Sequence, residues 1–264
     1  MSLIELDPRG CAAIAIDCLN TFMRSDGALS ISRYQHERCG LEQGEVQRAL
    51  NETAARIALL RRALYEAGIP QVQLQDAHVA EEVHGRRFHS MELVRKGESP
   101  DFVRTFPIHA LLDRDRRYGS PDQQAIDEIG LPELKPVLIH WFASSLPAEA
   151  RLSVDRELIF MKDDFCATPG NPYIRHLFWE LRCQARFTLI IFGVCDEICN
   201  LRNVMLFLAS FFKIIYVPDC TFPLNPERRA ATLDYLERFN AFAAGGERRV
   251  QLISSVQLVS ALHR

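Results

Sequence analysis

Short apolar runs alternate along the chain with longer segments in which apolar residues recur at helical spacing. Apolar runs of this length are typical of strands in a sheet that is covered on both faces. They predict strands at 11–16, 71–75, 137–141, 158–161, 187–192, 213–217 and 250–253. The periodic segments predict helices at 43–67, at 173–185, from Ile198 onward, at 226–242 and at the C-terminus. We therefore expect an α/β protein, a Rossmann-like three-layer αβα sandwich with a mostly parallel sheet.

Between residues 79 and 132 the chain is charged and its periodic signal is weak. The sequence has no internal repeat and no low-complexity segment. A chain of 264 residues is long enough for one large α/β domain with a substantial core. We therefore expect a single domain over 1–264, with 79–132 as an elaborated insertion near one end of the sheet.

The composition of the chain limits the kinds of binding partner and the cellular location that we expect. The formal net charge is −3, so neither nucleic acid nor a membrane surface is an expected partner. No apolar run approaches the roughly 20 residues of a membrane span, and the N-terminus lacks the basic region of a signal peptide. The 8 cysteines form no CxxC pair and are read as reduced thiols, which indicates a cytoplasmic protein.

Polar side chains follow four of the predicted strands, at or just beyond the point where each strand ends: Asp17, Asp76, Lys162 and Cys199. Because ligands bind at the carboxyl ends of parallel strands, we expect these side chains to lie close together. A carboxylate such as Asp17 can accept the proton of a thiol as a general base. A lysine beside both groups is expected to keep the carboxylate ionised and to lower the pKa of the thiol.

Cys199 lies where a predicted strand turns into a predicted helix. The free N–H groups and the positive dipole end of a helix N-terminus favour the thiolate, which is the nucleophilic form. The backbone N–H groups of the turn at 194–199 can also form an oxyanion hole. The combination predicts acyl transfer, in which attack on a carbonyl gives a thioester that water then hydrolyses. The alternative for any one buried cysteine is a packing role.

A second group of residues combines a carboxylate with imidazoles: Asp76, His78, His84 and His109. These ligand types suit zinc, iron or manganese, and an Asp-x-His pair after a strand presents two ligands from one turn. The alternative is that histidines in a charged loop are only solvated.

The segments that carry these residues resemble the motifs of the isochorismatase-like cysteine hydrolases, and within that family they are most similar to the nicotinamidases. The similar segments are 15–29, Asp-Ala-His at 76–78, Thr-Phe-Pro-Ile-His at 105–109, Lys162 with Phe-Cys-Ala at 165–167, and Gly-Val-Cys-Asp-Glu-Ile-Cys at 193–199. They occur in the order of the family and span essentially the whole chain. The resemblance implies the αβα fold of that family, with a six-stranded sheet.

By this resemblance, the catalytic triad is Asp17, Lys162 and Cys199. The peptide bond between Val194 and Cys195 is expected to be cis. The N–H groups of Cys195 and Cys199 are then the expected donors of the oxyanion hole.

The resemblance also implies how a substrate is held. Phe22 and Phe106 are expected to flank an aromatic ring, while the metal ion binds the ring nitrogen and directs the carboxamide toward the thiol. The implied metal ligands are Asp76, His78, His109 and, as in some members of the family, His84. Zinc is the expected divalent ion, with iron and manganese as alternatives.

The chain departs from the family pattern beside the nucleophile. Asp196 and Glu197 replace a Thr-Asp pair, and Asn203 replaces a threonine. A carboxylate next to a thiol raises the pKa of that thiol unless the carboxylate is paired, and Arg202 is the expected partner.

Three hypotheses follow. The first is a metal-containing amidase that hydrolyses nicotinamide, or a similar small heteroaromatic amide, to nicotinate and ammonia through a thioester on Cys199. The second keeps the triad and changes the substrate to another small amide or a carbamoyl compound. The third is a non-catalytic relative that binds a ligand. A homo-oligomer is expected, because the family usually assembles.

Overall fold

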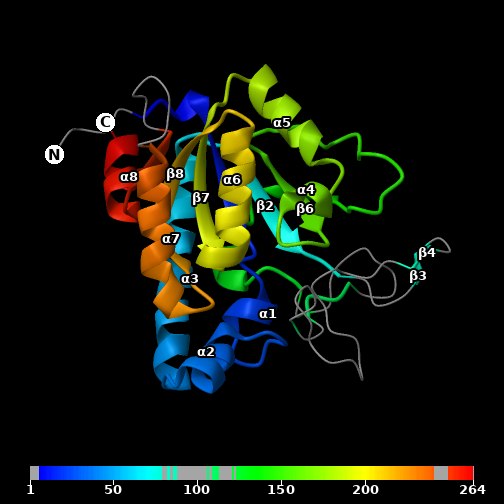
Figure 1. The fold of residues 1–264 in the computed structure, drawn as a ribbon. Helices are drawn as coiled ribbons and strands as arrows, with labels where there is room; N and C mark the ends of the chain where they lie inside the picture. Colours follow the sequence, from blue (N-terminus) through cyan, green and yellow to red (C-terminus); the bar gives the residue numbers. More distant parts are fainter. Residues whose placement is uncertain are drawn as a thin grey trace.

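Seven parallel strands form the central sheet, and helices cover both of its faces (Figure 1). The computed structural model describes residues 6–78, 82–83, 86–87, 106, 109–112, 121, 123–240 and 249–263. The strands are β1 (Cys11–Ile16), β2 (Gln71–Asp76), β5 (Lys135–Ile139), β6 (Arg156–Lys162), β7 (Thr188–Val194), β8 (Lys213–Phe222) and β9 (Val250–Leu252). Within the described residues the sheet has one strand more than the six expected. A separate antiparallel pair joins β3 (Glu82–Val83) to β4 (Arg86–Arg87).

The strand order is β5-β6-β2-β1-β7-β8-β9, so the first strand of the chain lies at the centre of the sheet. From β1 the chain passes to β2, then to β5 at the edge of the sheet and back to β6 between β5 and β2, and it then crosses to the other side of β1 with β7. In sheets of this kind the binding crevice lies where the strand order reverses, outside the carboxyl ends of the strands. Here that reversal lies between β1 and β7.

The helices form two layers. The α-helices of the described chain are α1 (Asn20–Met23), α2 (Ile31–Cys39), α3 (Gln43–Glu66), α4 (Ala167–Gly170), α5 (Ile174–Cys183), α6 (Leu201–Ala209), α7 (Pro226–Phe239) and α8 (Ser255–Leu262). One apolar core packs α2, α3 and α8 against the sheet, and the other packs α5, α6 and α7 against the opposite face. Alternation along β1 serves both cores, since Ala13 and Ala15 face the first and Ile14 and Ile16 the second.

Two segments differ from the sequence prediction. Residues 31–39 were not among the predicted helices, but they form α2, which is capped by the Ser30 side chain at its start and by Gly40 in the left-handed conformation at its end. The expected helix from Ile198 is split into a π-helical turn at Asp196–Asn200 and the α-helix α6. The polar composition of α2 masked its helical periodicity.

The expected insertion at 79–132 lies largely outside the described residues. Its described return toward the core is tied to the chain after β1 and β2. The His78 N–H donates to the Ala110 carbonyl at 3.0 Å, and Leu19 forms an antiparallel bridge with Ala125. These ties bring the segment that contains His109 to the carboxyl edge of the sheet.

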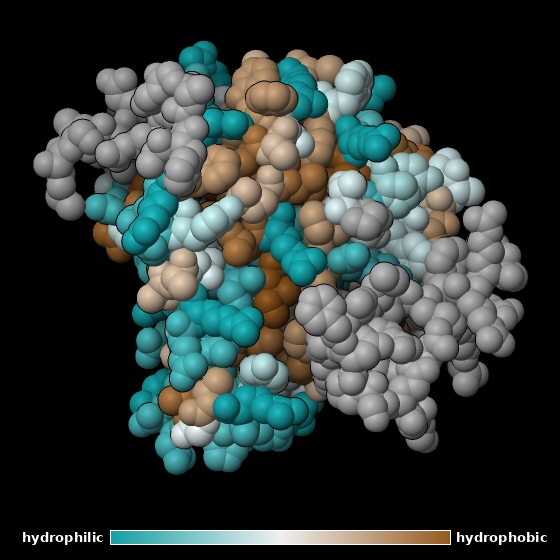
Figure 2. All heavy atoms as spheres, in the orientation of Figure 1, coloured by the Kyte–Doolittle hydropathy of each residue, from teal (hydrophilic) through white to brown (hydrophobic). Residues whose placement is uncertain are grey.

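Hydrophobic residues also reach the surface, in the middle of the face on which α6 lies (Figure 2). Leu201, Met205 and Tyr235, with Cys166 and Arg202, line an open and mainly apolar recess of about 430 Å³. Thus α6 presents apolar side chains to the surface as well as to the core. Among the described helices, none combines the length and the hydropathy that crossing a bilayer requires.

Candidate active site

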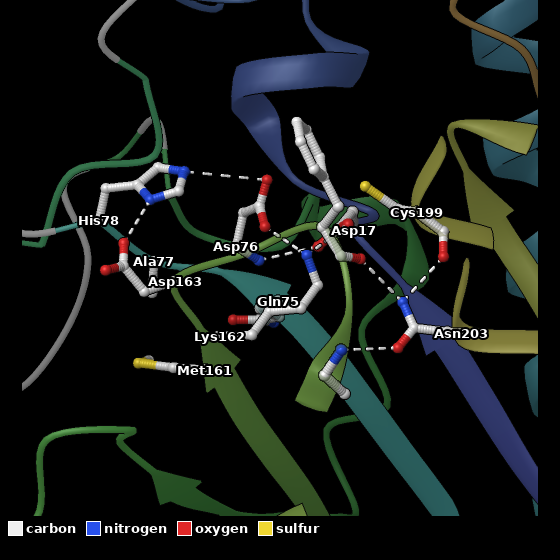
Figure 3. A network of polar contacts seen from close by, with 12 residues as sticks. Asp17, Gln75, Asp76, Ala77, His78, Met161, Lys162, Asp163, Cys199 and Asn203 are labelled. Carbon is white, nitrogen blue, oxygen red and sulfur yellow. Dashed lines mark hydrogen bonds and ion pairs between the residues drawn. The ribbon is translucent and has the colours of Figure 1, made fainter. Parts of the chain in front are cut away.

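Four neighbouring strands deliver polar side chains to one point of the carboxyl edge (Figure 3). Lys162 ends β6, Asp76 ends β2, Asp17 follows β1, and Cys199 follows β7. The Lys162 ammonium lies 2.9 Å from Asp17 Oδ2 and forms a second ion pair with Asp76. The other oxygen of Asp17 accepts a hydrogen bond of 2.8 Å from the Asp76 backbone N–H. One buried ammonium therefore holds two buried carboxylates in fixed positions.

Asp17 is buried to 1% exposure and contacts the nucleophile directly. A carboxylate oxygen of Asp17 lies within 4.8 Å of the Cys199 sulfur, and the interaction with the thiol lowers the pKa of Asp17. Burial and the nearby charge of Asp76 raise the pKa of Asp17 to about 7, although Lys162 opposes them. A carboxyl group that titrates near neutrality can both accept and return a proton, as general acid–base catalysis requires.

Asp76 remains ionised. Burial favours the neutral acid, but Lys162, His109 and His78 outweigh burial and lower the pKa of Asp76 below its ordinary value. The two carboxyl groups are therefore held in different protonation ranges by their surroundings, which separates their roles.

The protonation state of the Cys199 thiol differs from the one expected from the sequence. The helix terminus and Lys162 were expected to favour a thiolate. In the structure Cys199 is 4% exposed, and burial together with the Asp17 carboxylate raises the pKa of the thiol well above its ordinary value. Lys162 lowers that pKa only in part. The resting group is a thiol, because the cost of burying a charge exceeds the stabilisation that Lys162 provides.

The turn that carries Cys199 is built from irregular backbone. The Val194–Cys195 peptide bond is cis, and a π-helical turn follows at Asp196–Asn200. The Cys195 carbonyl accepts hydrogen bonds from the N–H groups of Ile198 at 3.2 Å and Asn200 at 3.1 Å. The turn therefore closes around Cys195, the residue that follows the cis peptide bond.

The two acidic residues beside Cys199 are paired, but not with Arg202. Asp196 is fully buried, accepts a hydrogen bond of 2.6 Å from the Tyr216 hydroxyl and lies 3.4 Å from the Arg229 guanidinium. Glu197 accepts hydrogen bonds from backbone N–H groups at the start of α7. Arg202 instead lies over the Phe165 ring, at 5.0 Å from its centroid. The expected ion pair with Arg202 was wrong, because β8 and α7 supply nearer partners.

The Asp76 carboxylate also faces two histidines. Asp76 Oδ2 lies 3.7 Å from His109 Nε2 and 4.0 Å from His78 Nε2, and the two imidazole rings meet edge to face at 4.9 Å between centroids. The three residues offer ligand atoms within 4.8 Å of one another, and all are buried. One carboxylate and two imidazoles are a donor set that fits zinc with further coordination positions open. The fourth expected ligand, His84, lies outside the described residues.

Aromatic rings surround the histidine pair. Phe22 meets the His109 ring edge to face at 5.5 Å, and Phe106 lies 6.4 Å from the same ring. Phe106 also contacts Phe165, at 5.7 Å between centroids. Phe22 and Phe106 therefore lie beside the metal-ligand set, and Phe165 extends this wall toward Arg202.

Three further residues support the site although the sequence did not assign them a role in it. Asn203 donates to the Cys199 carbonyl at 2.8 Å and accepts from the Ala167 N–H at 2.9 Å, which ties the nucleophile to the segment after Lys162. Trp141 Nε1 donates to the Ala77 carbonyl, and Asp163 contacts His78. Nothing in their local sequence distinguishes them from polar residues that make no such contacts. Only the adjacency of Asp163 to Lys162 was a signal.

Comparison with family models and with curated protein sequences found no match. Comparison with solved structures gives clear similarity of fold. The chain is similar to the nicotinamidase/pyrazinamidase PncA from Bacillus subtilis, with 18% identity, a TM-score of 0.57, and coverage of 91% of this chain and 98% of that one. It is also similar to a pyrazinamidase of Pyrococcus horikoshii in complex with zinc, with 16% identity, a TM-score of 0.56, and coverage of 93% and 99%.

A third similar structure is an isochorismatase-like hydrolase from Alkaliphilus metalliredigens, with 16% identity, a TM-score of 0.52, and coverage of 95% of this chain and 98% of that one. The chain therefore has the fold of the isochorismatase-like hydrolases.

Proposed function

We propose that this chain is an isochorismatase-like cysteine hydrolase that cleaves a small amide, and that its substrate is nicotinamide or a similar heteroaromatic amide. The observation that carries the proposal is the sharing of Lys162 between Asp17, which contacts the Cys199 thiol, and Asp76, which faces two histidines. A nucleophile with its base and a metal-ligand set thus lie side by side. The likeness of fold to nicotinamidases and pyrazinamidases supports the same reading.

The first half-reaction forms a thioester. Asp17 accepts the thiol proton as Cys199 sulfur attacks the carboxamide carbon, which avoids a free thiolate in the buried site. The N–H groups of Cys195 and Cys199 are the proposed donors to the oxygen of the tetrahedral intermediate. When the C–N bond breaks, Asp17 returns the proton to the nitrogen, and ammonia leaves.

The second half-reaction regenerates the enzyme. Asp17 accepts a proton from water as the water oxygen attacks the thioester carbonyl. The C–S bond then breaks, the carboxylic acid product leaves, and the sulfur recovers its proton from Asp17. Lys162 keeps its position throughout, because its ion pairs with Asp17 and Asp76 fix it at the junction of β1, β2 and β6.

Asp76, His78 and His109 are the proposed holders of a divalent ion, with zinc first and iron or manganese as alternatives. Such an ion supplies Lewis-acid binding of a substrate heteroatom or of water. The chain's own contribution is to keep Asp76 ionised and to enclose the set with Phe22 and Phe106, which exclude water and favour a flat ring.

An ammonia-release assay over a panel of amides tests the proposal. The panel includes nicotinamide, pyrazinamide, aliphatic amides and carbamoyl compounds. We expect release from the heteroaromatic amides, abolished by Cys199→Ala and reduced about 10²–10⁴-fold by Asp17→Asn, which removes the general base. Mass spectrometry of the wild type should detect acylation of Cys199.

Cys166→Ala is the matched control, because Cys166 is a half-buried cysteine on the neighbouring strand connection and has no role in the mechanism. It should retain full activity. Turnover that survives Cys199→Ala contradicts the mechanism, and release confined to carbamoyl compounds contradicts the substrate.

We further propose a cytoplasmic location and a homo-oligomeric assembly. The apolar surface of α6 supports assembly, because exposed apolar recesses are typical of association surfaces. Light scattering should give a multiple of the 30.1 kDa chain mass, and a monomeric mass contradicts the proposal.

A further inference from the structure

The backbone around His78 is fixed from several directions. The His78 N–H donates to the Ala110 carbonyl at 3.0 Å, and the His78 carbonyl accepts from the Leu112 N–H at 3.0 Å. The preceding carbonyl, that of Ala77, accepts a hydrogen bond of 3.0 Å from Trp141 Nε1. These contacts fix the position of the His78 Cα. Only the orientation of its imidazole ring is then left to be determined.

The side chain of Asp163 contacts Nδ1 of the His78 ring, whereas the other ring nitrogen, Nε2, faces Asp76 (Figure 3). Asp163 Oδ1 is 2.7 Å from His78 Nδ1, with the histidine fully buried and the carboxylate side chain 15% exposed. An ionised carboxylate only accepts hydrogen bonds, so the proton of the neutral imidazole is on Nδ1. The lone pair is then on Nε2, the atom that faces Asp76 Oδ2 at 4.0 Å.

The position of Asp163 does not depend on its contact with the histidine. Asp163 directly follows β6, and its N–H donates to the Gly170 carbonyl at 3.1 Å. Gly170 packs against the chain at this point, since a Cβ on it would lie 3.0 Å from the Lys162 Cβ. The sheet and the 163–170 segment thus place the carboxylate, and the carboxylate in turn orients the ring.

We propose that Asp163 is a positioning residue for the divalent metal: it holds the proton of His78 on Nδ1 and directs Nε2 toward the ion shared with Asp76 and His109. Carboxylate–histidine–metal arrangements of this kind fix the tautomer and increase the basicity of the ligand. The inference rests on the metal site of the proposed function. Asp163 touches neither the substrate nor the thiol in this scheme.

Zinc binding by Asp163→Ala and Asp163→Asn tests the inference, with Asp164→Asn as the matched control one residue further on. The affinity of the purified, metal-free proteins for zinc is measured by competition with a chromogenic chelator. We expect the dissociation constant to increase about 10–100-fold in Asp163→Ala. The increase should be smaller in Asp163→Asn, whose amide oxygen still accepts the Nδ1–H bond. Asp164→Asn should bind zinc as the wild type does.

Two further readouts separate positioning from a structural role. The visible absorption spectrum of the cobalt-loaded protein should change in Asp163→Ala, and the unfolding temperature of the metal-free protein should not. Wild-type zinc affinity in Asp163→Ala overturns the inference, as does an equal loss in Asp164→Asn or a wild type that binds no zinc. A wild type with the expected zinc affinities but without amide hydrolysis overturns the proposed function and leaves this inference standing.

Discussion

Burial controls the protonation of Asp17 and Cys199 more than their immediate neighbours do. Lys162 lies close enough to stabilise negative charge on Asp17, yet the pKa of Asp17 is raised to about 7 and the pKa of the Cys199 thiol is raised well above its usual range. The thiol therefore begins the reaction protonated, whereas Asp17 titrates near neutrality and is available in its ionised form to accept the thiol proton. The proton has a short path between them, because a carboxylate oxygen of Asp17 lies within 4.8 Å of the Cys199 sulfur.

The burial of Asp196 makes the stability of the protein depend on pH. Burial raises the pKa of Asp196 above its ordinary value of 3.8, although Arg229 and Tyr216 lower it. The folded state therefore retains a proton that the unfolded chain has lost, so the stability contributed by this group decreases as pH rises from the unfolded pKa through the folded one. Asp196→Asn removes this proton exchange. We expect the stability of the variant relative to wild type to increase as the pH rises through that window.

Urea denaturation of both proteins at a series of pH values measures the effect. Stability curves that stay parallel over the series would show that Asp196 has the same pKa in the folded and unfolded chains. A variant that loses stability relative to wild type as the pH rises would show the opposite shift, with Arg229 outweighing burial.

The close approach of β7 to β1 places the turn that carries the nucleophile. Gly193 has a φ of +126°, and a Cβ on it would lie 2.0 Å from the Ile16 carbonyl oxygen. No side chain fits there without a shift of backbone against backbone. The two strands can therefore deliver Asp17 and Cys199 to one point only if residue 193 is glycine.

Gly193→Ala is expected to destabilise the protein by about 2–6 kcal/mol, from unfavourable backbone geometry together with overpacking. Gly44→Ala is the control, because a Cβ at Gly44 meets no atom within 4 Å and alanine favours the helix in which Gly44 lies. Urea denaturation should show a large loss of stability for the first variant and none for the second. Equal stabilities would mean that β1 and β7 can separate freely at this point.

The strands and the residues that end them could be predicted because both depend on local pattern. The boundaries of β1 match the prediction at both ends, since its apolar run is bounded by Gly10 and Asp17. Residues 31–39 could not be predicted in the same way, because α2 is polar and owes its ends to Ser30 and Gly40 rather than to an apolar stripe. The π-helical turn before α6 was also missed, since its hydrogen bonds depend on the path of the chain.

The residues that make up the candidate site could be predicted from the sequence, but their burial and protonation states could not. Strand ends and motifs brought together Asp17, Lys162 and Cys199, but the sequence says nothing of how deeply each is buried. The expected thiolate was therefore wrong. The predicted partner of Asp196 was wrong for a similar reason. Arg229 is distant in sequence and approaches Asp196 only when α7 packs beside the turn that carries Cys199.

Metal binding should stabilise the whole fold, because the ligands come from separate parts of the chain that only folding brings together. His78 follows β2 and His109 lies on the return of the insertion, so an ion held by both links the two. Binding to the folded state alone adds about 2.7 kcal/mol when the free ion is at 100 times its dissociation constant, which corresponds to an increase of roughly 5–10 °C in unfolding temperature. We expect this increase when zinc is added to the metal-free wild type, and its loss in His109→Gln. His263→Gln, which changes an exposed histidine at the chain end, should keep the full increase. The same increase in unfolding temperature in all three proteins would show that zinc binds at another site, away from Asp76.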